Sequence, residues 1–221
     1  MFRGRHELAS VTAALLSVFV SASFAAAMGW RYARRRRPYQ LAWTIGLAMF
    51  ALAALAGLLA RSGGATENEY RVFYLFGAIL NVAWLALGTL YLLAPHIARW
   101  SLFAVLALTA AALVAVFASP VDITAAVDTG KGFDRSPIPR VLAGIGSGLG
   151  SLILIGGALW SAWGFFRRGH EGRRALANVI IAGGVLVAAA GGTAAFTGAS
   201  GVVEWTNFAG VSLIFIGFLL A

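Results

Sequence analysis

Charged residues in the polar segments of this chain could carry acid–base chemistry. Carboxylates that converge with an arginine and a tyrosine can act as general acid and base on a lipid or a small molecule. The simpler interpretation is that they are solvated helix ends, because Glu67 and Glu69 suit the positive N-terminal end of a following helix. We call this set the outer mouth: Glu67, Glu69, Arg71, Asp122, Asp128 and Asp134. Tyr70 and Glu204 fall in the same kind of polar segment.

A stripe of polar, aromatic and small residues along the apolar stretch 71–94 could form a binding surface. Its members recur at steps of four and three, so they share one face of a helix. In lipid such a face turns toward other helices, because an exposed amide in hydrocarbon is unfavourable. The stripe then either packs the bundle, with Asn81 bonded to a neighbouring helix, or forms the wall of a cavity for a largely apolar ligand. It consists of Tyr70, Tyr74, Gly77, Asn81, Trp84, Gly88 and Tyr91.

Residues in other apolar stretches could face the same interior. The first and fifth stretches have serines at helical spacing, and the last has an asparagine. The predicted ligand-binding residues are Tyr74, Asn81, Trp84, Tyr91, Ser17, Ser21, Ser151 and Asn207. The fifth stretch also has glycines at spacings that favour tight helix crossings, within the chain or in a homo-oligomer: Gly144, Gly146, Gly148 and Gly150.

The elements that must position these residues are seven long apolar stretches. A hydrophobic fraction of 60%, a charged fraction of 11% and a mean hydropathy of +0.84 exclude an ordinary soluble domain. A helix needs about 20 apolar residues to cross a bilayer. We therefore expect an all-α membrane protein, a seven-helix bundle that forms a single domain over residues 1–221. Its predicted spans are 8–30, 41–60, 71–94, 100–118, 140–165, 175–197 and 205–221.

The charged residues alternate between connecting segments, which predicts the orientation. Connections on one side carry ten arginines against one acidic residue, whereas those on the other carry seven basic and seven acidic residues. Short cytoplasmic loops retain arginine and lysine. We therefore expect a bacterial cytoplasmic membrane, with the N-terminus outside, the C-terminus inside and the inner arginines beside anionic lipid headgroups. The net charge of +9 then serves membrane insertion, and no nucleic-acid partner is expected.

Both ends of the chain allow an alternative. Arg3 and Arg5, an apolar run and a small-residue stretch that ends in residues 24–27 (Phe-Ala-Ala-Ala) resemble a cleavable signal peptide. The arginine run that follows this stretch instead favours a retained first span with its N-terminus outside. The last stretch, 205–221, is short for a crossing, which leaves open a cytoplasmic tail beyond Ala221.

The apolar stretches lack the groups that cofactor, metal and proton chemistry need. No Asp, Glu, Lys, Arg or His lies within the interior of a stretch, which disfavours a proton-driven transporter. The last stretch has no lysine for a retinal Schiff base, and the histidines lie near stretch ends. Cysteine is absent from the sequence. We expect no cofactor and no metal site.

Three segments carry a resemblance to other sequences. They are 37–43 (Arg-Pro-Tyr-Gln-Leu-Ala-Trp), 70–74 (Tyr-Arg-Val-Phe-Tyr) and 88–93 (Gly-Thr-Leu-Tyr-Leu-Leu). Through these motifs the second and third stretches resemble a group of uncharacterised bacterial seven-span membrane proteins of about this length. The resemblance implies a prokaryotic cytoplasmic-membrane protein and carries no known activity.

Three classes of function remain open. The uncharged interior and the glycine-rich surfaces favour a non-enzymatic bundle that binds a hydrophobic ligand, a lipid or a partner membrane protein, as a sensor or accessory subunit. The first alternative is a transporter or channel for an uncharged or apolar solute, with the stripe as its pathway. The second is an outward-facing enzyme that acts on lipid through the outer-mouth carboxylates. The connector 119–139 is either a solvated link or a lid over an outward-facing cavity.

Overall fold

The computed structural model describes residues 2–129, 131–167, 172–196 and 203–220, and every regular element within them is helical. Seven crossings in this part of the chain are long and apolar enough to span a membrane, so the protein is a multi-pass, all-α membrane protein by length and composition. They are formed by α1, α2, α3–η1–α4, α5, α7–η2–α8, α9 and α10. The elements are α1 (Phe2–Arg35), α2 (Pro38–Gly63), α3 (Glu67–Phe73), η1 (Tyr74–Leu80), α4 (Asn81–Leu93), α5 (Pro95–Ala118), α6 (Ile123–Thr129), α7 (Pro137–Ala143), η2 (Gly144–Leu149), α8 (Gly150–Arg167), α9 (Gly172–Phe196) and α10 (Val203–Leu220), where η marks a π-helix.

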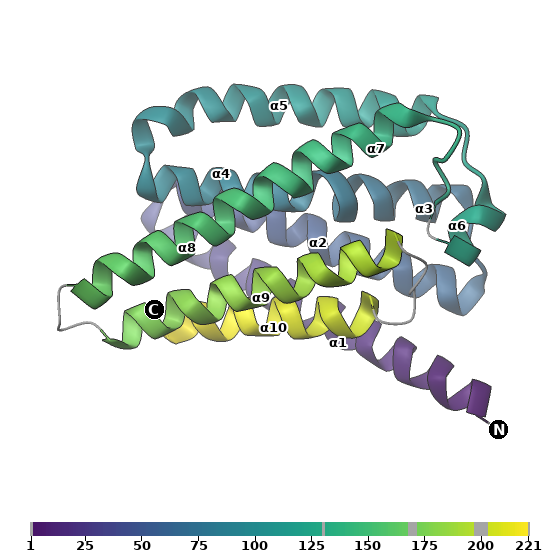
Figure 1. Ribbon diagram of the computed structural model, residues 1–221, viewed down its shortest axis with the longest axis horizontal. Coiled ribbons are helices and arrows are strands. Elements are labelled where there is room, and N and C mark those ends of the chain that lie inside the picture. Colours follow the sequence, from purple (N-terminus) through teal and green to yellow (C-terminus); the bar gives the residue numbers. More distant parts are fainter. Residues whose placement is uncertain (1, 130, 168–171, 197–202, 221) are drawn as a thin grey trace.

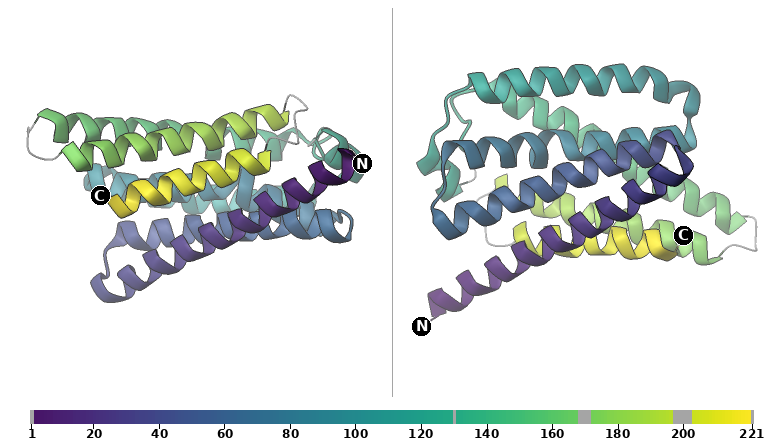
Figure 2. Two further views of the ribbon diagram at one scale, coloured as in Figure 1. Left: turned by 90° about the horizontal axis from the view of Figure 1, so that it is seen from below. Right: turned by 180° about the vertical axis from the view of Figure 1, so that it is seen from behind.

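The crossings run alternately between the two ends of the bundle (Figure 1). The α1–α2 turn, the α4–α5 turn, the end of α8, the start of α9 and the end of α10 lie together at one end. The α2–α3 turn, α6, the end of α9 and the N-terminal end of α1 lie at the opposite end (Figure 2). The arginine-rich segments therefore share one end. We call it the arginine-rich end, and the opposite one the mouth end.

Prolines and a capping box set where several helices begin. The box at α3 is reciprocal, because the Thr66 hydroxyl accepts the N–H of Glu69 at 3.3 Å and the Glu69 carboxylate accepts the N–H of Thr66 at 3.0 Å. A proline at the start of a helix loses no hydrogen bond, since that N–H has no helical partner. The fifth crossing consequently begins at its first proline instead of at the predicted residue 140. The prolines that open helices are Pro38, Pro95 and Pro137.

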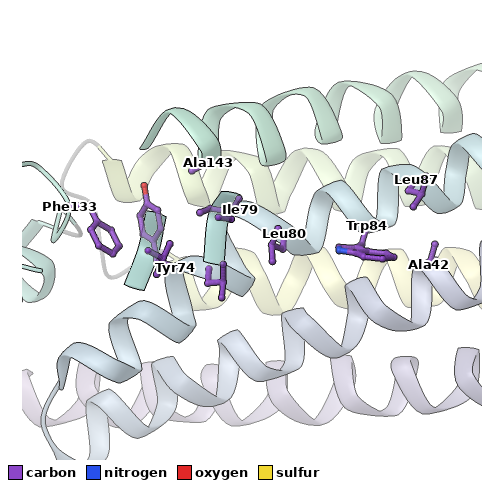
Figure 3. Packing of buried hydrophobic residues seen from close by; sticks show 11 residues of the cluster. Ala42, Tyr74, Ile79, Leu80, Trp84, Leu87, Phe133 and Ala143 are labelled. Atoms are coloured by element: carbon purple, nitrogen blue, oxygen red, sulfur yellow. The ribbon is translucent and has the colours of Figure 1, made fainter. Parts of the chain in front are cut away.

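The third crossing is the most buried, with 50% of its most apolar window inside the protein. Side chains along it form the core cluster of Figure 3, where α2 contributes Ala42 and α5 contributes Ala112 and Val116. Phe133 reaches the same cluster from the connector between α6 and α7. The stripe-bearing crossing is therefore the centre of the bundle. Its labelled core residues are Tyr74, Ile79, Leu80, Trp84 and Leu87.

The fifth crossing packs on the third through two of its glycines. A Cβ at Gly146 would collide with the carbonyl oxygen of Ile79, and one at Gly150 would lie 3.0 Å from the carbonyl oxygen of Val82. The two π-helices η1 and η2 lie at this crossing, where the Ser147 hydroxyl of η2 donates to the carbonyl of Ala78 in η1 at 2.7 Å. The glycine pair thus forms a close crossing within the chain.

Candidate functional site

A cavity of about 1560 Å³ opens at the mouth end and extends to the middle of the bundle. Its wall is formed by α2, the outer half of the third crossing, the fifth crossing, α9 and α10. Ala126 and Val127 of α6 lie at the rim. No residue of α1 or α5 in the described ranges takes part. The cavity therefore lies between the central third crossing and the last two helices.

Two ion pairs line the mouth of the cavity. Glu204 at the start of α10 is buried and pairs with Arg61 near the end of α2. Asp134 accepts a hydrogen bond from Arg140 of α7, with 3.0 Å between Oδ1 and Nη1. The second carboxylate oxygen of Glu204, Oε2, is buried and has no partner among the described residues. The mouth thus carries both positive and negative groups.

Four polar side chains lie deeper in the wall: Asn81, Ser147, Ser151 and Asn207. The carboxamide oxygen of Asn81 accepts the backbone N–H of Val82 at 2.7 Å. No described residue accepts from its amide nitrogen, which leaves a hydrogen-bond donor on the wall. Because only a few polar groups interrupt an apolar surface, they would orient a ligand that the apolar wall holds.

Apolar side chains close the cavity half-way along the bundle. Toward the arginine-rich end, α1, α2 and α10 pack around Phe24, whose ring centre lies 4.7 Å from that of Phe215. The cavity is therefore open at one end of the bundle and closed toward the other. The deepest lining residues on the five surrounding crossings are Leu47, Leu85, Leu154, Val185 and Ile214.

The predicted stripe divides where the third crossing changes from π-helix to α-helix. Its outer members line the cavity: Tyr70, Tyr74, Gly77 and Asn81. Trp84 does not line the cavity and lies in the buried cluster, to which Tyr74 also belongs (Figure 3). A π-helix has wider turns than an α-helix, and each extra residue rotates the following positions by about 100° relative to a continuous α-helix. After η1 the wall therefore continues at Val82 and Leu85.

Half of the predicted ligand-binding residues lie on the cavity wall: Tyr74, Asn81, Ser151 and Asn207. The others lie elsewhere: Trp84, Tyr91, Ser17 and Ser21. The two serines are buried in α1, where each hydroxyl donates to a carbonyl one turn earlier, at 2.8 Å and 2.6 Å. Tyr91 lies in a separate pocket at the arginine-rich end.

Arg71 holds the end of a neighbouring helix. Its Nη1 donates to the carbonyls of Val116 and Phe117, the last turn of α5, at 2.6 Å and 2.9 Å. Glu67, one turn earlier in α3, pairs with it at 3.3 Å. These two outer-mouth residues therefore stabilise the junction between α3 and α5, since a cation suits the C-terminal end of a helix.

The remaining outer-mouth residues do not meet at one point. Asp122 accepts the N–H of Ala125 at 3.0 Å, as an N-terminal cap of α6. Glu69 and Asp134 line the cavity. The side chain of Asp128 lies outside the described residues. Each described carboxylate thus has a structural partner of its own.

The connector 119–139 is docked onto the bundle. Phe133 is 1% exposed, and its ring centre lies 5.4 Å from that of Tyr70 and 4.9 Å from that of Tyr74. Sequence reasoning missed this residue. The signal was an isolated aromatic residue between a glycine and an aspartate in an otherwise polar segment.

Sequence reasoning also missed two charged cavity residues, Arg61 and Arg140. In the sequence, the two arginines are recognisable only as part of the equal numbers of basic and acidic residues on one side of the membrane. Arg61 and its partner Glu204 are 143 positions apart, so no local spacing indicates their pairing. Only the tertiary arrangement brings them together.

Among the described residues, no three His, Cys, Asp or Glu side chains are grouped so that they could hold a metal ion. Comparisons with known protein families, with curated proteins and with solved structures find no match for this chain. The bacterial seven-span resemblance stays a prediction. Function must therefore be inferred from the cavity itself.

Proposed function

We propose that this protein is a non-enzymatic membrane protein that binds an amphiphilic lipid or a similar hydrophobic ligand, as a sensor or as an accessory subunit of a partner membrane protein. The observation that carries the proposal is the cavity, which is charged and open at one end and apolar and closed at the other. The arginine distribution favours the arginine-rich end in the bacterial cytoplasm. The mouth then faces outward.

The volume of the cavity favours a lipid-sized ligand. Pockets for drug-sized molecules usually measure about 300–1,000 Å³. The cavity of about 1560 Å³ exceeds that range, and its depth is bounded by leucine, valine and isoleucine side chains. An acyl or isoprenoid chain would be stabilised there by about 25 cal/mol of free energy for each Å² of apolar area that it buries.

The mouth favours a polar group of mixed or no net charge. Arg61 and Arg140 are each neutralised by a carboxylate. A purely anionic headgroup would meet Glu204 and Asp134 as well as the arginines. A zwitterionic or hydroxyl-bearing headgroup could instead interact with both the arginines and the carboxylates.

The test is native mass spectrometry of the detergent-purified protein, followed by lipid analysis of what co-purifies. Gly148 lines the cavity, and a Cβ built there meets nothing within 4 Å, so Gly148→Phe fills the cavity without a collision at its base. Wild-type protein should carry a stoichiometric amphiphile that this variant lacks.

Gly156 supplies the matched control. It lies in the same crossing, a Cβ built there also meets nothing within 4 Å, and it does not line the cavity. Gly156→Phe should retain the amphiphile. Equal retention by both variants, or a wild-type protein that takes up no lipid from mixed micelles, would contradict the proposal.

Transport of an uncharged solute is a second candidate, favoured by one observation. The cavity ends midway along the bundle, where Asn81 and Ser151 lie near its closed end. Transporters place their substrate sites near the bilayer midplane and expose them to one side at a time. Uptake of the co-purified molecule into protein-containing vesicles, absent from empty vesicles, would favour transport over binding alone.

A further inference from the structure

A second pocket lies at the arginine-rich end, between the α1–α2 turn and the α4–α5 turn. It measures about 710 Å³ and shares no lining residue with the cavity. Its polar residues come from both turns, and prolines form its sides: Arg35, Arg37, Pro38, Tyr39, Tyr91 and Pro95.

The two arginines of this pocket have no partner among the described residues, unlike their neighbours. Arg31 lies over the ring of Phe218 at 4.4 Å, and Arg34 lies over the ring of Trp30 at 4.0 Å. The side chains of Arg35 and Arg37 form no ion pair, hydrogen bond or ring contact with the described residues. The pocket thus presents two guanidinium groups that nothing in the described structure neutralises.

Two helices also direct their positive ends at the pocket. α2 and α5 both begin there with a proline, and neither has a side chain that caps its N-terminus. The partial positive charge of a helix N-terminus favours an anion. α1 and α4 also end at this pocket, where Arg35 and Leu92 lie in their last turns, so helix ends of both signs meet there and the two arginines supply the net positive charge.

Tyr39 adds a fixed hydroxyl donor. Its ring packs edge-on against Trp43, with 5.5 Å between ring centres. Its hydroxyl oxygen lies 3.4 Å from the amide nitrogen of Gln40, which donates to it. The phenolic proton therefore remains available to an acceptor in the pocket.

We propose that this pocket binds the phosphate group of an anionic membrane lipid. Guanidinium groups bind phosphate oxygens through paired, charge-assisted hydrogen bonds, and the phenol and helix ends supply further donors. The lipid source is favoured over free phosphate because exposed apolar residues adjoin the pocket and would contact acyl chains: Leu92, Leu93 and Ile97. The site is independent of the proposed function of the cavity.

The experiment compares two double variants of equal charge. Arg35→Gln/Arg37→Gln removes the pocket arginines, whereas Arg31→Gln/Arg34→Gln removes two arginines that lie over aromatic rings outside the pocket. Each protein is mixed with equal amounts of phosphatidylglycerol and phosphatidylcholine, and retained lipid is counted by native mass spectrometry. The pocket variant should bind phosphatidylglycerol about tenfold more weakly than wild type, and the control should change by less than about twofold.

Three outcomes would overturn the proposal. An equal loss in both variants would mean diffuse attraction of the whole arginine cluster to anionic lipid. No loss in either would mean that the pocket holds no headgroup. If inorganic phosphate binds in an Arg35- and Arg37-dependent way while phosphatidylglycerol does not, the site belongs to free phosphate.

Discussion

The phenol hydroxyl of Tyr70 accepts a hydrogen bond from the backbone N–H of Gly132 at 2.9 Å, which joins the third crossing to the connector over the mouth. The two residues are 62 positions apart. A Cβ at position 132 would lie 2.5 Å from the Tyr70 ring, so glycine permits the close approach. With Phe133 buried beside it, this bond fixes the connector against the cavity rim.

Tyr70→Phe should loosen the connector. The substitution keeps the ring but leaves the N–H of Gly132 without its partner, which costs about 1–3 kcal/mol where the group stays buried. We expect faster hydrogen exchange in residues 123–133, measured by mass spectrometry, and a lower thermal unfolding temperature.

Tyr74→Phe is the matched control. Tyr74 packs on the same Phe133 ring, but its hydroxyl is buried and has no partner in the described structure. Removing that hydroxyl should leave stability unchanged or raise it, since an unsatisfied polar group is lost. Identical exchange in both variants would show that the Tyr70 bond does not hold the connector.

Gly146→Ala should destabilise the bundle, because its Cβ would collide with the backbone of Ile79. Overpacking of this kind costs about 1–3 kcal/mol. Gly148→Ala, one half-turn away and facing the cavity, should instead stabilise its helix by up to about 1 kcal/mol. Thermal denaturation in detergent distinguishes the two, and equal effects would contradict the crossing geometry.

Asn81→Leu should weaken binding of the amphiphile by about 1 kcal/mol, the usual contribution of one hydrogen bond. The measurement is the ligand-induced shift in unfolding temperature. Asn178→Leu is the control, because Asn178 bonds within α9 and lies outside the cavity. A lower stability with an unchanged ligand shift would mean that Asn81 only packs the bundle.

The orientation predicts opposite locations for two reporters. An enzyme reporter fused after Arg36 should be active only in the cytoplasm, and one fused after Asp128 only outside, because short loops rich in arginine are usually retained on the cytoplasmic side. Reporters on the same face would contradict the seven-crossing topology, and reporters on exchanged faces would reverse the orientation alone.

The number and class of the helices could be predicted because they depend on local composition. Long apolar stretches must satisfy their backbone within a helix, and Pro38 and Pro95 sit near the beginnings of such stretches. The cavity-facing half of the stripe followed from helical spacing. The prediction that Trp84 belongs to the same face assumed an unbroken α-helix, and η1 interrupts that periodicity.

The charged part of the cavity could not be predicted in this way. Arg61 pairs with Glu204, and Arg140 with Asp134, through contacts that depend on how distant helices meet. Phe133 is buried only because the connector folds back onto Tyr70 and Tyr74. The spacing of residues along one helix carries no information about contacts with residues that are distant in the sequence.

The mouth half of the bundle is hollow, whereas the other half is packed around Phe24, and this difference gives the bundle an uneven mechanical response. A close-packed interior is nearly incompressible, whereas a cavity can widen or narrow with small helix displacements. In a bilayer these halves lie in different leaflets. Lateral pressure in the leaflet that surrounds the cavity would therefore change the cavity volume. A bound molecule that holds the helices apart would enlarge the cross-section of the protein in that leaflet alone.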